Sequence, residues 1–332
     1  MNQTNTINMR NYKFDNFKFL LMFLVVFGHS LELFKGDERK LVYQIIYLFH
    51  MPAFIFITGY FAKFQPKKIV RRYLITYLVF QTLYLIFDAI VIKETTEFTL
   101  QYTKPYWHLW FLMAAGFYYT LIPFIQTQNK KYQIGIMVVS VVVSLLAGYD
   151  KTVGYTLTLS RVLTFVPFFT IGYYSAKHKN WLQNKLGKKQ KSIIAIGSFF
   201  ICVVSVYWLK TQTIKTTILY GSVNYEKASY DMWIRGLLLL FALAWIIALL
   251  LLMPNCKIPI ISICGQHTFW VFILQGFILR LEKKYQIYQY VQGVNLLLAA
   301  VSSLVILVVM SYPWIEKIKR KKGYVEKKDM SA

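Results

Sequence analysis

The stretch "NFKFLLMFLVVFGHSLELF" at residues 16–34 decides the fold class. It is apolar enough to cross a bilayer, because about twenty such residues span the hydrocarbon core. Yet it contains Lys18 near one end and His29 near the other, and Asp15 comes directly before it. Ionisable groups are costly in lipid and usually face the interior of a helix bundle. The stretch therefore predicts a membrane helix with one polar face.

Similar apolar runs continue along the 332-residue chain, of which 57% is hydrophobic and 18% aromatic. The runs are continuous and do not alternate, which favours helices over a β-barrel. We predict an all-α, polytopic membrane helix bundle of about ten transmembrane helices, at residues 14–34, 41–62, 70–92, 107–126, 132–149, 159–176, 192–210, 231–253, 258–279 and 291–315. The predicted organisation is a cytoplasmic segment 1–13, a transmembrane domain 14–315 and a basic, disordered cytoplasmic tail 316–332. The first run lacks the small-residue cleavage site of a signal peptide and is predicted to remain as a span.

The formal net charge of +24 lies mostly in alternate loops between the predicted spans. Basic inner loops are what the positive-inside rule predicts when the N- and C-termini are both cytoplasmic. This distribution favours orientation and contact with anionic membrane lipids over nucleic-acid binding. The cysteines, Cys202, Cys256 and Cys264, follow no disulfide or metal-binding spacing and are interpreted as packing residues. No metal and no bound cofactor is predicted.

Two segments share a local pattern of proline followed by Gly-Tyr. "MPAFIFITGYFAK" ends the second predicted span, and "VPFFTIGYYSAK" ends the sixth. Proline inside a span is tolerated where neighbouring groups satisfy the freed backbone. We interpret the pattern as a similar local solution in two spans and not as a domain duplication.

Lys18 and His29 share one face of the first predicted span. They are eleven residues apart, which at about 100° per residue is close to three full turns, and this places them about 16 Å apart along the axis. Asp15 lies one turn before Lys18 on nearly the same face. Lys18 could instead extend to the inner interface, and His29 could be a hydrogen-bonded structural histidine. The shared face favours a functional group of three.

Further polar residues fall in or beside other predicted spans: His50, Trp107, His108, Arg161, Gln266, His267 and Gln275. Trp107 is also explained by the aromatic belt of membrane proteins, and Asp231 and Arg235 could pair on one helix face. An imidazole is suited to taking a proton from an attacking hydroxyl. Arg71 and Arg72, at the inner end of the third predicted span, are suited to the phosphates of a cytosolic ligand. These patterns predict a buried polar site but do not specify a reaction.

The segment "FDNFKFLLMFLVVFGHS" resembles the first-span signature of the acyltransferase-3 family of integral membrane acyltransferases. That signature is a basic residue, ten residues and a histidine, with an aspartate just before. Lysine at the basic position is similar to the fucose 4-O-acetylase-like branch, whereas much of the family has arginine. The blocks "FHMPAFIFITGYFAK", "YWHLWFL", "RVLTFVPFFTIGYY" and "ICGQHTFWVFILQGF" also resemble the family, in the same order.

The resemblance implies an acyl transfer, usually of acetyl from acetyl-CoA, onto a hydroxyl of a cell-surface carbohydrate. It implies that His29 is the catalytic histidine, with Asp15 and Lys18 as its partners, and that Arg71 and Arg72 meet the CoA phosphates. Arg161 falls in a block where the branch also has arginine. Gln275 departs from the family, because relatives often have histidine there. The hydrolase-like domain fused to some members is absent from this sequence.

We therefore expect a multi-pass O-acyltransferase of a cell membrane, most naturally the bacterial plasma membrane, with His29 as general base. His50, Trp107, His108, Arg161, Gln266 and His267 are expected to contact substrate. The acceptor is expected to be a lipid-linked sugar or an outer glycan. A transporter or flippase of a polar or lipid-linked substrate is the alternative, since buried ionisable groups and broken helices suit it equally well. A non-catalytic membrane component of a polysaccharide assembly complex is a third reading.

Overall fold

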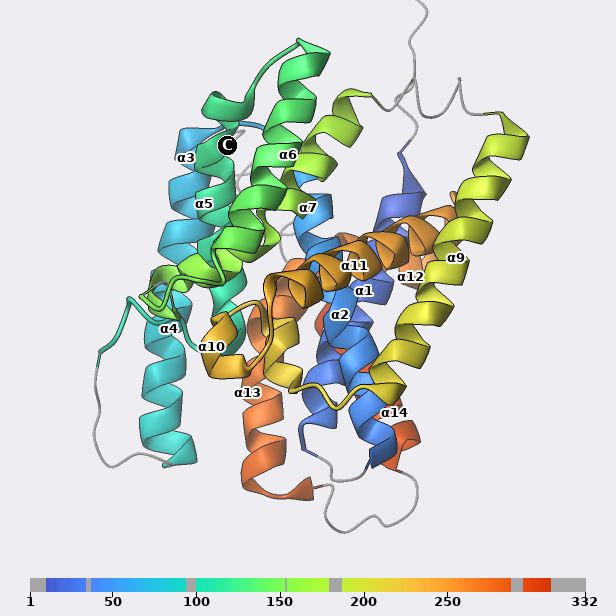
Figure 1. The fold of residues 1–332 in the computed structure, drawn as a ribbon. Helices are drawn as coiled ribbons and strands as arrows, with labels where there is room; N and C mark the ends of the chain where they lie inside the picture. Colours follow the sequence, from blue (N-terminus) through green and yellow to red (C-terminus); the bar gives the residue numbers. More distant parts are fainter. Residues whose placement is uncertain are drawn as a thin grey trace, which may run out of the picture.

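The computed structural model describes residues 10–33, 37–93, 100–152, 154–178, 187–287 and 295–311. These residues form helices and no strand, which confirms the all-α class. Figure 1 shows α1 and α2 in the interior of the bundle, with α4 and α9 at opposite edges. The predicted tail 316–332 and most of the predicted segment 1–13 lie outside the described residues.

The elements follow one another along the chain as α-helices, two π-helical segments and three short 3-10 helices. In order they are α1 (Tyr12–Leu31), α2 (Asp37–Tyr60), α3 (Pro66–Lys68), π-helical η1 (Ile69–Ile75), α4 (Thr76–Phe87), π-helical η2 (Asp88–Ile92), 3-10 helix η3 (Trp107–Leu109), α5 (Trp110–Ile125), α6 (Lys130–Leu146), 3-10 helix η4 (Thr156–Thr158), α7 (Leu159–Lys177), α9 (Lys188–Thr211), 3-10 helix η5 (Thr216–Tyr220), α10 (Tyr225–Ala228), α11 (Met232–Leu252), α12 (Pro259–Gln266), α13 (Thr268–Lys284) and α14 (Asn295–Ser311).

Six helical runs are long and apolar enough to cross a membrane by length and composition, and the bent pair of α12 and α13 would make a seventh. The six are α1, α2, the run from α3 to η2, η3 with α5, α9 and α11. Among the other predicted spans, α6 and α14 have 17 residues each, and α7 carries a cation near either end. The helices support a multi-pass membrane protein, while the number of ten and the cytoplasmic termini remain predictions.

The two Pro…Gly-Tyr segments pack directly against each other, as the end of α2 against α7. A Cβ atom on Gly59 would lie 2.1 Å from the Phe169 carbonyl oxygen, and one on Gly172 would lie 2.1 Å from the Phe56 carbonyl oxygen. Small residues let membrane helices approach this closely. The reciprocal contact fixes α2 against α7, and these two helices carry His50 and Arg161.

The predicted ninth span, 258–279, is not one straight helix. Its two halves, α12 and α13, are bent by 81° at His267. Gly265 brings α12 against the start of α1, since a Cβ atom there would lie 1.9 Å from the Asp15 carbonyl oxygen. Asn16 of α1 adds a hydrogen bond to the Cys256 carbonyl at 3.1 Å and accepts one from Ser262 at 2.7 Å. The bend is therefore fastened to the first turns of α1.

Candidate active site

His29 lies buried in the last turn of α1 and is held through one ring nitrogen. Its Nδ1 atom lies 3.0 Å from the Tyr47 hydroxyl and 3.4 Å from Glu32 Oε1. The Tyr47 hydroxyl donates to the same Glu32 oxygen at 2.7 Å, and the Tyr43 hydroxyl donates to it at 3.0 Å. The Tyr220 hydroxyl lies 2.7 Å from that of Tyr43 and extends the chain. The imidazole is therefore fixed by a network that spans α1, α2 and η5.

This network indicates which nitrogen of His29 carries the proton. A tyrosine has one hydroxyl proton, and that of Tyr47 is directed to Glu32. The bond between His29 Nδ1 and the Tyr47 oxygen must then use a proton on Nδ1. We assign the neutral ring on these hydrogen-bonding grounds as the Nδ1–H tautomer. Nε2 keeps its lone pair, which is what a general base requires.

Glu32 follows the end of α1, three residues after His29, so both side chains share one helix face. Burial raises the pKa of this carboxyl, but hydrogen bonds from His29, Tyr47 and Tyr43 outweigh it and hold the pKa below its ordinary value of 4.5. Sequence reasoning did not select Glu32, Tyr43 or Tyr47. The available signals were the His-x-x-Glu spacing near the end of the first run and two tyrosines four residues apart in "YQIIY".

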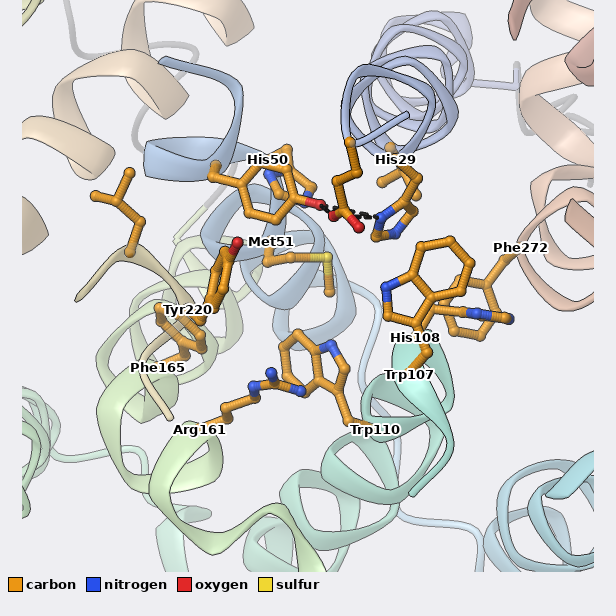
Figure 2. Close-up of a pocket in the computed structure, with 14 residues that line it drawn as sticks. His29, His50, Met51, Trp107, His108, Trp110, Arg161, Phe165, Tyr220 and Phe272 are labelled. Atoms are coloured by element: carbon orange, nitrogen blue, oxygen red, sulfur yellow. Dashed lines mark hydrogen bonds and ion pairs between the residues drawn. The ribbon is translucent and has the colours of Figure 1, made fainter. Parts of the chain in front are cut away.

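A cavity of about 170 Å³ opens on His29 (Figure 2). It brings together five side chains that the sequence had singled out, His29, His50, Trp107, His108 and Arg161. The rest of its wall consists of Glu32 and of apolar and aromatic side chains from α1, α2, α5, α7, η5 and α13. In Figure 2 Arg161 and Trp110 lie across the open space from His29. The structure thus brings these five side chains together around one space, and their roles stay a prediction.

A second cavity, of about 440 Å³, also reaches His29. His29, Glu32 and Trp107 line both cavities, and Tyr106 and Arg280 belong to the second alone. The Trp107 ring lies 4.4 Å from the His29 ring between centroids. Trp107 also has a φ of 28°, and such left-handed backbone costs about 1–3 kcal/mol and gathers at functional sites. The imidazole thus lies at the junction of two spaces.

The polar side chains of the smaller cavity differ in how they are satisfied. His50 Nδ1 donates to the Ile46 carbonyl at 2.7 Å, which leaves its Nε2 for a ligand. His108 is buried, and neither ring nitrogen has a hydrogen-bond partner within the described ranges. The guanidinium of Arg161 lies over the Trp110 ring, 4.7 Å from its centroid. Polar atoms that the protein leaves without partners are candidates for contact with substrate.

The other predicted residues gather at the opposite end of α1. Asp15 forms ion pairs with Arg10 at 2.7 Å and with Lys18 at 2.9 Å. Arg71 and Arg72 lie in the π-helical η1, and Arg72 lies over the Phe269 ring of α13, 5.1 Å from its centroid. Neither cavity that reaches His29 is lined by these ionic residues.

The same end of the molecule contains Gln266, the last residue of α12, and His267 at the bend. Gln275, in contrast, is fully buried in α13, and its amide has no hydrogen-bond partner in the described part of the chain. Within those residues, no group of three His, Cys, Asp or Glu side chains is placed to hold a metal ion. The structure therefore separates the predicted residues into a group around His29 and a group about 16 Å away along α1.

A family model described as an acyltransferase domain matches residues 11–314. The chain belongs to the acyltransferase-3 family. The family resemblance of the five sequence blocks is thereby confirmed, whereas the fucose 4-O-acetylase-like branch stays a prediction.

The chain is also similar to the nodulation protein NolL of Mesorhizobium japonicum. It is 26% identical over 215 residues, which are 59% of this chain and 56% of the relative. The match thus spans little more than half of the relative's length. No solved structure matches the chain.

Proposed function

We propose that the protein is a membrane O-acyltransferase that moves an acetyl group from acetyl-CoA to a hydroxyl of a cell-surface or lipid-linked carbohydrate. The observation that carries the proposal is the imidazole of His29, held through Nδ1 by Tyr47 and Glu32 at the junction of two cavities. Transfer between two substrates requires both to meet at one base in the right geometry. Two spaces that share one imidazole fit this requirement.

In the proposed step, His29 Nε2 takes the proton of the sugar hydroxyl as its oxygen attacks the thioester carbonyl carbon. A new C–O bond forms, the C–S bond breaks, and the thiolate leaves with the proton from His29 as the CoA thiol. The Glu32 carboxylate stabilises the imidazolium that exists between these events, as an acidic partner does in related catalytic groups. His50, Trp107 and His108 are proposed to contact the substrates in the smaller cavity.

The donor is proposed to enter at the other end of α1, from the cytoplasm. Arg71 and Arg72 suit CoA phosphates, because guanidinium groups bind phosphate in a bidentate manner. Lys18, tied to Asp15 and 24% exposed, adds positive charge there. Gln266 and His267 at the adjacent bend are proposed to line the same entrance. This orientation places both termini in the cytoplasm of a bacterial cell, with the bundle in the plasma membrane among anionic lipids.

A transporter or flippase is the second candidate, and one observation favours it. The α12–α13 pair is bent by 81°, and broken helices with buried polar groups are typical of transporter binding sites. A transporter moves a whole substrate and transfers no acetyl group.

The test uses the full chain in lipid nanodiscs with acetyl-labelled acetyl-CoA and two sets of acceptors, methyl glycosides and a lipid-linked glycan. The proposal expects label in an acceptor with wild-type protein and none with His29→Ala. His178→Ala is the matched control, because His178 lies beyond the end of α7 and bonds Gln133 at 2.7 Å, outside both His29 cavities. Label transfer by His29→Ala would contradict the proposed role of His29 as the base. If wild-type protein transfers no label, the acyltransferase proposal fails and the transporter remains as the candidate function.

A further inference from the structure

Arg161 brings a positive charge to the smaller cavity without an anionic partner among the described residues. Its guanidinium lies over the rings of Trp110 and Tyr155, 4.7 Å and 5.5 Å from their centroids. Its Nε atom is buried and has no hydrogen-bond partner in the described part of the chain. A buried charge is costly unless it is paired and hydrogen-bonded. A site that keeps such a charge is suited to an acceptor from a substrate, because among the described residues no carboxylate lies within ion-pair distance of the guanidinium.

Arg235 shows how this same chain satisfies a buried guanidinium that has a structural task. It lies in the first turns of α11, is 3% exposed, and donates to the Ser144 carbonyl at 3.0 Å and the Val223 carbonyl at 3.3 Å. It also donates to the Tyr230 hydroxyl. Asp231, which could have paired with Arg235, instead caps α11 by accepting from the Ile234 backbone amide. Among the described residues, Arg161 has no comparable set of acceptors.

The backbone before Arg161 is held in an unfavourable conformation. Leu157 and Thr158 have φ values of 52° and 58°, and a β-branched residue such as Thr rarely adopts them. Such strain costs about 1–3 kcal/mol per residue and persists where the surrounding structure requires it. Arg161 follows directly in the first turn of α7, whose N-terminal dipole adds positive potential. The turn therefore directs an already costly cation into the cavity.

We propose that Arg161 is a catalytic residue that stabilises the oxyanion formed on the thioester carbonyl, an inference that rests on the proposed acetyl transfer. When the sugar oxygen bonds to the carbonyl carbon, the electron pair of the C=O bond moves to that oxygen. The guanidinium donates hydrogen bonds to it until the C–S bond breaks and the carbonyl re-forms. Donors aimed at such a developing charge are usually a large part of catalysis.

Charge balance favours an oxyanion over a permanently anionic acceptor. The cavity already contains the Glu32 carboxylate opposite Arg161, so its two fixed charges cancel. In the transition state the new imidazolium of His29 and the new oxyanion also cancel. A carboxylate or phosphate on the acceptor would instead add an uncompensated negative charge close to Glu32, and close like charges repel.

The experiment measures kcat and KM of the full chain in nanodiscs with acetyl-CoA and two acceptors, an uncharged methyl hexoside and the matching methyl uronide. Arg161→Gln is expected to lower kcat about 100- to 1,000-fold for both acceptors, with KM values within about threefold of wild type. Arg161→Lys is expected to lower kcat about tenfold, because an ammonium lacks the planar fork and the stacking of guanidinium. Arg235→Gln is the structural control and is expected to lower the melting temperature without changing kcat of the folded protein.

Three results would overturn the inference. The first is a rise in KM for the uronide alone, which would make Arg161 a receptor for an acidic sugar. The second is a lower melting temperature with unchanged kcat, as for Arg235→Gln. The third, should Arg161→Gln fail to fold, is a wild-type kcat in Arg161→Lys. If wild-type protein transfers no acetyl group, the proposed function fails first, and the inference fails with it.

Discussion

The two ends of α1 use ionisable residues in opposite ways. At its start, Asp15 is closed between Arg10 and Lys18, so the charges there are satisfied by one another. At its end, His29 is held through Nδ1 alone by Tyr47 and Glu32, and its other nitrogen remains for chemistry. One helix stripe thus contains a paired ionic cluster and the histidine that we propose as general base. Residues on one helix face therefore need not belong to one site, because the rise of the helix places Lys18 and His29 about 16 Å apart.

The largest expected effect comes from removing the proposed general base. His29→Ala is expected to lower the acetyl transfer rate by at least about 100-fold and up to 10,000-fold, the range of general base catalysis. The measurement is label transfer from acetyl-CoA under saturating substrates. A residual rate within about tenfold of wild type would show that His29, at the C-terminal end of α1, is not the general base.

The next test alters the group that holds the base. Glu32→Gln is expected to lower kcat roughly 10- to 100-fold, which is about 1.4 to 2.8 kcal/mol of barrier. The amide no longer stabilises an imidazolium, and its NH₂ group can donate to Nδ1 and move the ring proton to Nε2. Glu226→Gln is the matched control, since Glu226 forms an exposed ion pair with Lys151 away from His29. Equal rates for both variants would remove Glu32 from the mechanism.

The opposite end of α1 should respond in binding and not in chemistry. Lys18→Met is expected to raise KM for acetyl-CoA about three- to tenfold with kcat nearly unchanged, because only an ionic contact with the donor is lost. Lys151→Met serves as the control cation on the surface. A large fall in kcat with unchanged KM would instead show that Lys18 acts together with His29 in the chemical step.

The smallest effect concerns stability against pH. Because the pKa of Glu32 in the folded protein lies below its ordinary value of 4.5, its stabilisation is present above that pH and is lost as the pH falls through the folded value. The melting temperature of wild type should therefore exceed that of Glu32→Gln near neutrality, and the difference should shrink on acidification below about pH 4.5. A constant difference across that range would contradict the ionised Glu32 network.

Much of the candidate site could be predicted because ionisable residues are costly in lipid and are therefore easy to recognise within apolar runs. His29, His50, His108 and Arg161 stood out in apolar runs, and the structure brings all four to one cavity. The sequence did not single out Glu32, because it lies at the end of the first predicted span, just beyond α1, where a carboxylate is common. Its importance arises only from hydrogen bonds across to α2.

Contacts between distant segments of the chain could not be predicted from the sequence. The bend at His267 lies next to the close approach of Gly265 to the Asp15 backbone, a contact between residues far apart in the chain. The reciprocal packing of Gly59 and Gly172 was visible as a repeated pattern, but nothing in either segment said that the two would meet. Sequence periodicity describes one helix at a time and carries no information on its neighbour.

A helical membrane protein of the acyltransferase-3 family, and the residue types of its polar interior, could be read from the chain alone, because lipid strongly penalises unpaired polar groups. Which of these residues lie together became visible only in the folded protein. The tertiary structure tied His29 to Glu32 and Tyr47 and kept Asp15 and Lys18 at the far end of α1. It also left the Nε atom of Arg161 without an acceptor among the described residues. The physical reason is that hydrogen bonds act over about 3 Å, and packing between helices sets which atoms come that close.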